Sequence, residues 1–338
     1  MEYQLNCWCD QGTLHMIKKA LIVGINEYPK PYRLSGCVND AKEIQRLLLD
    51  NGTGAHNFDT KTLLDGRATK ANILDGVEKL FEKETDVALF YFAGHGSDDE
   101  NDGSIISCEG EPISFAELMQ KVNGSKSKYK IVILDCCYSG KFGCDSRIGD
   151  KTTLSENTVI LTACSSCECA TEDCKSMHGT FTKLLIGALE GGASDVLGRI
   201  TAGSIYAYVD QALGAWDQRP YFKANVSSFS PIREIKPKID VAELKKGLDY
   251  FEKENSNFKL DPSFEETNFK GNKQHKAEKP YVKAENVQKM KTLQKMNRNG
   301  LVTPCNEEFM YFAAMRSDAV QLTCLGRHYW NLHKKHRI

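Results

Sequence analysis

Short apolar segments alternate with segments whose apolar residues recur at helical spacing over the first two thirds of the chain. Apolar runs of four to eight residues, bounded by turn residues, are typical of strands buried on both faces. Spacings of three and four predict the helices between them. The predicted strands cover 19–25, 60–64, 86–93, 129–134 and 158–162. The predicted helices cover 37–49, 70–84, 114–122, 180–189 and 203–213.

This alternation of strands and helices predicts an α/β domain over residues 16–235. Strands that read as unbroken Val, Ile and Leu runs favour a mostly parallel sheet with helices on both faces. Thr69 precedes one predicted helix and is a suitable N-cap residue. An α/β domain of this size buries a large core and needs no disulfides or metal to fold.

The character of the chain changes after residue 235. Residues 236–285 are polar and rich in Asn, Lys, Glu and Pro, with one short helix near 241–250, which predicts a linker. Order resumes at 286–338 with a helix, a turn at Gly300, further short elements and a last helix from Thr323. We expect this to be a small winged-helix-like module.

Composition and charge place few limits on function. The 338 residues carry a formal net charge of -1, so no overall field favours nucleic acid, membrane or acidic partners. No apolar run is long enough to span a bilayer, and the first fifteen residues lack the pattern of a signal peptide. We therefore expect a cytoplasmic protein, in which the 13 cysteines are reduced thiols.

Two reactive side chains follow two of the predicted strands. His95 comes shortly after the strand at 86–93, and Cys137 shortly after the strand at 129–134. Catalytic sites of open α/β sheets form beyond the carboxyl ends of strands, so the two side chains meet if these strands are neighbours. An imidazole can take the proton of a thiol and return one to a leaving amine. The backbone amides of Gly96 and Cys137 are candidates for binding the oxyanion.

The residues around both positions carry a family resemblance. Tyr91-Phe-Ala-Gly-His-Gly-Ser97, followed by Asp135-Cys-Cys-Tyr-Ser-Gly140, resembles the metacaspases and bacterial caspase-like peptidases of clan CD. The resemblance extends from Ala20 to about Leu213. It implies a caspase-like fold with a six-stranded sheet, and a cysteine endopeptidase that acts through a thioester acyl-enzyme without a cofactor. The motif picks Cys137 as the nucleophile, with Cys136 at a variable position and His95 as acid and base.

The same resemblance implies a preference for basic substrates. Asp40 and Asp135 match the two carboxylates of the metacaspase S1 pocket, Cys37 matches a wall position, and Ala93 stands where those enzymes often have serine. Two carboxylates in a narrow pocket favour a guanidinium or ammonium group. We therefore expect cleavage of proteins or peptides after Arg or Lys. The alternative for Asp40 is a charge that complements a helix N-terminus.

Two clusters invite a metal, but we predict none. Many metacaspases require calcium, and an acidic loop follows His95; without a recognisable ligand pattern, we expect a solvated loop there. Five further residues could be read as a zinc cluster, but their spacing fits no standard template. The acidic residues are Asp98, Asp99, Glu100 and Asp102, and the zinc candidates are Cys164, Cys167, Cys169, Cys174 and His178.

A glycine-containing segment at 141–151 follows the nucleophile. Arg147 and Lys151 within it are candidates for self-cleavage, given the expected basic preference.

The C-terminal module suggests a partner. Lys289, Lys291, Lys295 and Arg298 lie on one predicted helix and could contact phosphates of a nucleic acid. A solvated helix face or a protein-binding surface are the alternatives, and a membrane partner is not expected. The competing functional hypothesis is a catalytically silent caspase-like scaffold that acts through this module.

Overall fold

The computed structural model describes residues 16–98, 103–136, 153–163, 180–213, 220–272 and 277–338. The chain packs as two units. The first runs to residue 194 and resumes over 199–235, and the second comprises 195–198 and 236–338. No helix of the described residues is long and apolar enough to cross a membrane.

A six-stranded sheet forms the centre of the first unit, in the order β10-β8-β7-β3-β1-β2. Five strands run parallel, and only β10 is antiparallel to its neighbour β8. This arrangement confirms the predicted mostly parallel sheet of six strands. The strands are β1 (Lys18–Gly24), β2 (Asp59–Leu64), β3 (Val87–Ala93), β7 (Tyr129–Asp135), β8 (Thr158–Thr162) and β10 (Tyr221–Asn225).

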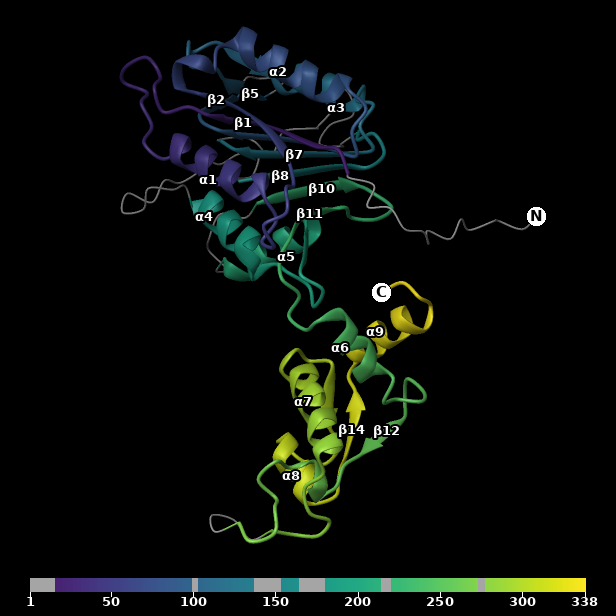
Figure 1. Ribbon diagram of the computed structural model, residues 1–338. Helices are drawn as coiled ribbons and strands as arrows, with labels where there is room; N and C mark the ends of the chain where they lie inside the picture. Colours follow the sequence, from purple (N-terminus) through teal and green to yellow (C-terminus); the bar gives the residue numbers. More distant parts are fainter. Residues whose placement is uncertain (1–15, 99–102, 137–152, 164–179, 214–219, 273–276) are drawn as a thin grey trace, which may run out of the picture. The chain divides into compact units, whose positions relative to one another are not determined.

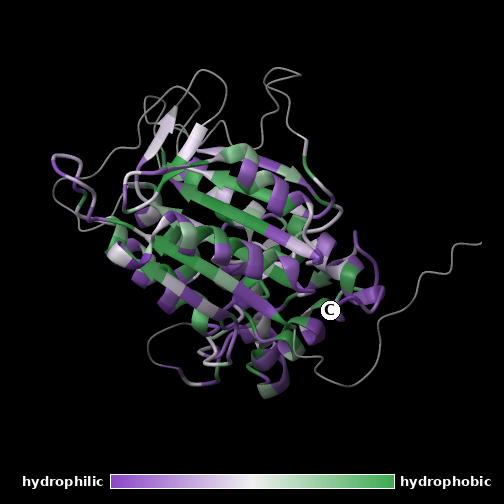
Figure 2. Ribbon diagram, turned by 90° about the horizontal axis from the view of Figure 1, so that it is seen from above, coloured by the Kyte–Doolittle hydropathy of each residue, from purple (hydrophilic) through white to green (hydrophobic). Residues whose placement is uncertain are grey.

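Helices cover both faces of this sheet (Figure 1). Alternate strand residues point to opposite faces, so Tyr91 and Ile133 join one apolar core while Phe90 and Val132 join the other. Figure 2 shows the long strands as mostly hydrophobic, as burial on both faces requires. One face is covered by α1 (Cys37–Leu49), α4 (Thr180–Gly187) and α5 (Ala202–Ala212), and the other by α2 (Lys70–Glu82) and α3 (Phe115–Asn123).

Side-chain caps fix where several of these helices begin. The Thr69 hydroxyl accepts a hydrogen bond from the Asn72 amide, as its position before α2 predicted, and Ser114 caps α3 in the same way. Thr201 and Ser204 form a capping box at α5.

Small elements complete the first unit. The segment after β3 forms an antiparallel sheet of β4 (Gly96–Asp98), β5 (Gly103–Ile106) and β6 (Pro112–Ser114), where only a solvated loop was expected at its start. A two-stranded sheet pairs β9 (Arg199–Thr201) with β11 (Pro231–Glu234). Two further turns are the 3-10 helix η1 (Asp65–Arg67) and the π-helix η4 (Ala188–Gly192).

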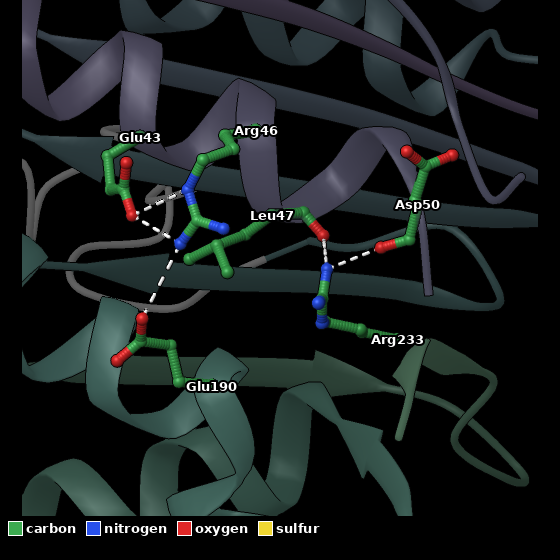
Figure 3. A network of polar contacts seen from close by, with 6 residues as sticks. All are labelled: Glu43, Arg46, Leu47, Asp50, Glu190 and Arg233. Atoms are coloured by element: carbon green, nitrogen blue, oxygen red, sulfur yellow. Dashed lines mark hydrogen bonds and ion pairs between the residues drawn. The ribbon is translucent and has the colours of Figure 1, made fainter. Parts of the chain in front are cut away.

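A buried arginine from β11 holds the C-terminal end of α1 (Figure 3). The Arg233 guanidinium donates hydrogen bonds to the backbone carbonyls of Leu47 and Asp50. These carbonyls have no partner within the helix, and a cation at this end also complements the helix dipole. Burial lowers the pKa of Arg233, with the nearby Arg46 adding to the effect. Arg233 therefore anchors the helix whose opposite end carries Cys37 and Asp40.

The second unit has its own apolar core, and this corrects the predicted linker. Residues 236–285 contribute Leu244, Phe251, Leu260 and Phe264 to that core, and β12 pairs with β14. This stretch is polar on average, but it contains single apolar residues whose side chains are buried. Its elements are α6 (Val241–Leu248), β12 (Asn257–Lys259) and the 3-10 helix η5 (Pro262–Phe264).

The remaining elements of the second unit come from the last fifty-five residues. They are α7 (Ala284–Arg298), β13 (Val302–Pro304), α8 (Met310–Met315), β14 (Ala319–Leu322) and α9 (Cys324–Lys334). The strands form an antiparallel sheet in the order β12-β14-β13. Because β12 belongs to this sheet, the unit begins well before residue 286. Its likeness to a winged helix stays a prediction.

Candidate active site at the carboxyl edge of the sheet

The site lies where β1, β3 and β7 end side by side. Their last residues, Gly24, Ala93 and Asp135, are paired in register. The strands that precede His95 and Cys137 are therefore neighbours. This is the condition under which the two side chains were predicted to meet. The Gly94 amide donates a hydrogen bond to the Asp135 carbonyl at 3.2 Å, so the backbone pairing continues to the residue before His95.

The imidazole of His95 is held in one tautomer. Its Nε2 lies 2.7 Å from the backbone carbonyl oxygen of Tyr32. A carbonyl only accepts hydrogen bonds, so Nε2 carries the hydrogen and, in the neutral ring, Nδ1 carries the lone pair. The partly buried ring also packs against Tyr28, with ring centroids 4.5 Å apart. His95 is thus oriented from one side by Tyr32 and from another by Tyr28.

Tyr28 also holds the backbone of this segment. Its hydroxyl accepts a hydrogen bond from the His95 amide at 2.9 Å and donates one to the Ile106 carbonyl at 3.2 Å. The Ile106 amide in turn donates to the His95 carbonyl at 3.0 Å. Burial raises the pKa of Tyr28 well above its usual value, so the hydroxyl stays protonated. These contacts tie the turn after β3 to both β5 and the segment after β1.

Gly94 is required by this close approach. A Cβ at position 94 would lie 2.4 Å from the Tyr28 hydroxyl and 2.9 Å from the Phe92 ring. Gly96, on the other side of His95, is the first residue of β4 and is paired with Ile105. Its predicted role in binding the oxyanion, together with the amide of Cys137, stays a prediction.

A chain of hydroxyl groups leads to Asp135. Thr182, in the first turn of α4, donates to the Asp135 carboxylate at 2.6 Å, and its oxygen lies 2.7 Å from the Tyr91 hydroxyl. Thr182 has one hydroxyl proton, which it gives to the carboxylate, so Tyr91 is the donor to Thr182. Both hydroxyl-bearing residues are 0% exposed, whereas Asp135 is partly buried at the strand end.

Asp40 and Cys37 reach the same place from the first turn of α1. Gly24 allows this, since a Cβ there would lie 2.5 Å from the Cys37 carbonyl and 2.6 Å from the Ala41 side chain. Burial raises the pKa of the Tyr91 phenol well above its usual value, and the nearby charges of Asp135, Asp40 and the Cys37 thiol add to this.

The predicted pocket residues come from the start of α1 and from the carboxyl ends of β3 and β7. Cys37, Asp40 and Asp135 approach Tyr91, and Ala93 lies on the same face two residues further along the strand. Asp40 is only 2% exposed, which is deeper than a charge at a solvated helix end needs to be. Ala93 has a small side chain and is paired in register with Asp135.

The adjacent cysteine has a different environment. Cys136 is 1% exposed and belongs to the apolar core on the α2 and α3 face, opposite to Tyr91 and Ala93. It acts there as a small apolar side chain. This position agrees with the sequence motif, which treats residue 136 as variable.

Several predicted residues lie outside the described residues. They include the nucleophile Cys137, the self-cleavage candidates Arg147 and Lys151, the acidic residues 99–102 and the cysteines and histidine between 164 and 178. Among the residues that the structure does describe, no three potential metal ligands lie together.

Tyr28, Tyr32 and Thr182 were missed as site residues by sequence reasoning. Tyr91 and Thr182 both belong to segments that carry the family resemblance, which was the available signal. Nothing in that resemblance joined them to each other or to Asp135. Tyr32 contributes only a backbone carbonyl, for which the sequence has no signal.

The mostly parallel sheet with helices on both faces is the fold of caspases. The profile of the caspase-domain family matches residues 17–229, and the chain belongs to this family of cysteine peptidases. Caspase-1 from Spodoptera frugiperda has the same fold, with a TM-score of 0.50 and 12% identity over 65% of this chain and 92% of that one.

Metacaspases are among the relatives by sequence. The chain is 29% identical to metacaspase-7 of Arabidopsis thaliana over 192 residues, which cover 50% of this chain and 46% of the relative. It is 32% identical to metacaspase-1 of Candida albicans over 90 residues, which cover 25% of this chain and 20% of the relative. The chain thus spans less than half the length of these two relatives.

Proposed function

We propose that this protein is a cysteine endopeptidase that cleaves after Arg or Lys, with Cys137 as nucleophile and His95 as acid and base. The observation that carries the proposal is the register of β3 with β7, which pairs Ala93 with Asp135. Residues 95 and 137 each follow this pair by two positions in the sequence. Family membership and the orientation of the His95 ring support the same assignment.

The tautomer of His95 supports the following proton transfers. Nδ1 takes the proton of the Cys137 thiol, and the thiolate attacks the carbonyl carbon of the scissile peptide bond. As the tetrahedral intermediate collapses, the carbon–nitrogen bond breaks and the leaving amine takes the proton from Nδ1. A water molecule then gives a proton to Nδ1 and attacks the thioester carbon. The carbon–sulfur bond breaks to release the carboxylic product, and Nδ1 returns the proton to the sulfur, which restores the thiol.

The charges near Tyr91 support the basic preference. Asp40 and Asp135 are carboxylates from different elements that approach the same phenol. A guanidinium or ammonium group offers several hydrogen-bond donors to such a pair, and an acidic side chain would be repelled. The residue before the scissile bond is therefore proposed to be Arg or Lys.

A peptide panel tests this function. Otherwise identical fluorogenic peptides ending in Arg, Lys or Asp are assayed with wild type, Cys137→Ala and His95→Ala, and Cys136→Ala is the matched control. We expect cleavage after Arg and Lys, loss in the first two variants and retention in Cys136→Ala if that variant folds. Robust cleavage after Asp alone would contradict the specificity, and full activity in Cys137→Ala would contradict the nucleophile.

Self-cleavage at Arg147 or Lys151 follows from the same specificity. Both residues lie shortly after the proposed nucleophile in a stretch that contains glycines. Mass spectrometry of purified wild type and Cys137→Ala tests this proposal. A cut after either residue in wild type alone supports it, whereas an identical cut in both proteins would show that another protease made it.

For the second unit we propose a protein partner rather than a nucleic acid. Three of the four basic residues that could contact phosphates are paired with carboxylates within the unit: Lys289 with Glu285, Lys291 with Glu266, and Lys295 with Glu243. A salt-dependent gel shift with the full chain tests this choice. A shift that Arg298→Ala weakens would favour nucleic acid instead.

A further inference from the structure

The carboxylate of Asp135 is supported by groups that the reaction itself does not use. Thr182 from α4 donates its hydroxyl proton to the carboxylate at 2.6 Å, and Tyr91 from β3 donates to Thr182 at 2.7 Å. Both side chains are 0% exposed, so water does not compete for these hydrogen bonds. The relay starts in the apolar core and ends at the partly buried carboxylate on the strand end.

We propose that this relay sets substrate specificity, because Tyr91 and Thr182 keep Asp135 oriented and ionised toward the basic group of the substrate. The inference rests on the proposed cleavage after Arg or Lys. Thr182 and Tyr91 are positioning residues, since they act through Asp135. The structure thereby assigns a role to two residues from elements that are far apart in the sequence.

The chemistry of the relay explains why it favours a charged carboxylate. A hydroxyl that donates to a carboxylate stabilises the ionised form over the protonated one. Asp40 is a second carboxylate near the Tyr91 phenol, and a like charge close to Asp135 disfavours its ionised form. A donor that reaches Asp135 from the core therefore offsets part of the repulsion between the two carboxylates.

The relay also restricts the orientation of the Asp135 carboxylate. Thr182 has a β-branched side chain with few rotamers, and the Tyr91 side chain is fully buried. One oxygen of Asp135 is occupied by Thr182. This contact restricts the orientation of the carboxylate plane.

The test compares a charged substrate with an uncharged one of the same shape. Peptides ending in Arg or in citrulline are assayed from pH 5 to 8 with wild type, Thr182→Val, Thr182→Ser and Tyr91→Phe. Thr158→Val and Tyr129→Phe are matched controls, since both are buried residues of the same sheet near the other ends of their strands. The readout is the ratio of kcat/KM for Arg to kcat/KM for citrulline.

We expect Thr182→Val to lower this ratio about tenfold, mainly through KM for the Arg peptide, as the loss of a hydrogen bond to a charged group predicts. In Thr182→Val, the ratio should also begin to fall at a higher pH than in wild type as the pH is lowered. Thr182→Ser should retain the wild-type ratio, and Tyr91→Phe should show a smaller loss in the same direction. Equal losses for both peptides in a folded Thr182→Val protein would overturn the proposal.

A second measurement separates this inference from the proposed function. If wild type cleaves neither peptide, the proposed function fails, and the relay is then tested by ¹³C NMR of aspartate-labelled protein. The Asp135 carboxyl signal is assigned by its loss in Asp135→Asn. Its titration midpoint should rise in Thr182→Val and not in Thr158→Val. An unchanged midpoint would overturn the relay whatever the activity.

Discussion

The Nε2 atom of His95 lies 2.7 Å from the carbonyl oxygen of Tyr32, a residue 63 positions earlier in the chain. This contact decides which ring nitrogen carries the lone pair, and so which one can take a proton from a thiol. It is a backbone contact, and no single side-chain substitution at position 32 would remove it. The Tyr28 side chain can be changed, and its hydroxyl holds the backbone of His95.

Tyr28→Phe is predicted to lower activity more than stability. The change removes the hydroxyl that accepts from the His95 amide and donates to the Ile106 carbonyl, while the ring contact with His95 remains. We expect kcat to fall about tenfold, because a small displacement of His95, the proposed base, is costly. The free energy of unfolding should fall by about 1–2 kcal/mol. Steady-state kinetics and urea denaturation check both values.

The control for Tyr28→Phe is Tyr206→Phe, which removes a hydroxyl from a partly buried tyrosine that stacks on Phe222. It should leave kcat near the wild-type value. If Tyr28→Phe also keeps its kcat, the hydroxyl has no part in placing His95.

Gly94→Ala is predicted to destabilise the first unit and to reduce activity. The new methyl group would overlap with the Tyr28 hydroxyl and the Phe92 ring, both of which are buried. Overpacking of this kind costs about 1–3 kcal/mol. Gly66→Ala is the matched control, because nothing lies within 4 Å of a Cβ at that position. Equal stability of both variants in urea denaturation would show that the turn after β3 can relax.

Arg233→Met is predicted to weaken the anchor of α1. Methionine keeps much of the apolar stem but leaves the Leu47 and Asp50 carbonyls without the donor they now have. The free energy of unfolding should fall by about 1–3 kcal/mol. Arg46→Met is the control within the same network (Figure 3). Arg46 is 57% exposed and pairs with Glu43 and Glu190, so its loss should cost less than about 1 kcal/mol.

Alkaline pH is predicted to destabilise the first unit through its buried tyrosines. Burial raises the pKa of Tyr91 and of Tyr28, so above about pH 10 the unfolded chain loses protons that the folded chain retains. Stability is therefore fully present below pH 10 and falls as the pH rises further, by up to about 1.4 kcal/mol per pH unit for each tyrosine. Tyr91→Phe should reduce this slope. Urea denaturation between pH 9 and 11 measures the slope of unfolding free energy against pH. The same slope in Tyr91→Phe and wild type would contradict the prediction.

The sequence predicted the central sheet well because its strands are strongly apolar and buried on both faces. The strand predicted at 86–93 is β3, Val87–Ala93, and the helix predicted from Lys70 is α2. The edge strand β10 was not picked out by its pattern, since Tyr221–Asn225 is largely exposed and mixes polar and apolar residues. The prediction of a linker at 236–285 was wrong because it rested on the average polarity of that segment. Single buried residues such as Phe251 and Leu260 decide how the segment packs.

The candidate site was predictable only as far as local motifs reach. His95, Asp135 and Asp40 follow from residue type, position after a strand or helix start, and family resemblance. The contact of Thr182 with Asp135 joins α4 to the end of β7, and no local pattern encodes such a meeting. The relay through Tyr91 therefore required the register of the sheet and the packing of α4 upon it.

Active-site labelling shows whether Cys137 is the nucleophile and whether the site accepts a basic residue. Wild type and Cys137→Ala are incubated with a peptidyl chloromethyl ketone that ends in Arg, and the adduct is located by peptide mapping. We expect one equivalent of label on Cys137, none in Cys137→Ala, and no labelling by the matching reagent that ends in Asp. Labelling of another residue by the Arg reagent, or labelling of Cys137 by the Asp reagent alone, would contradict this expectation.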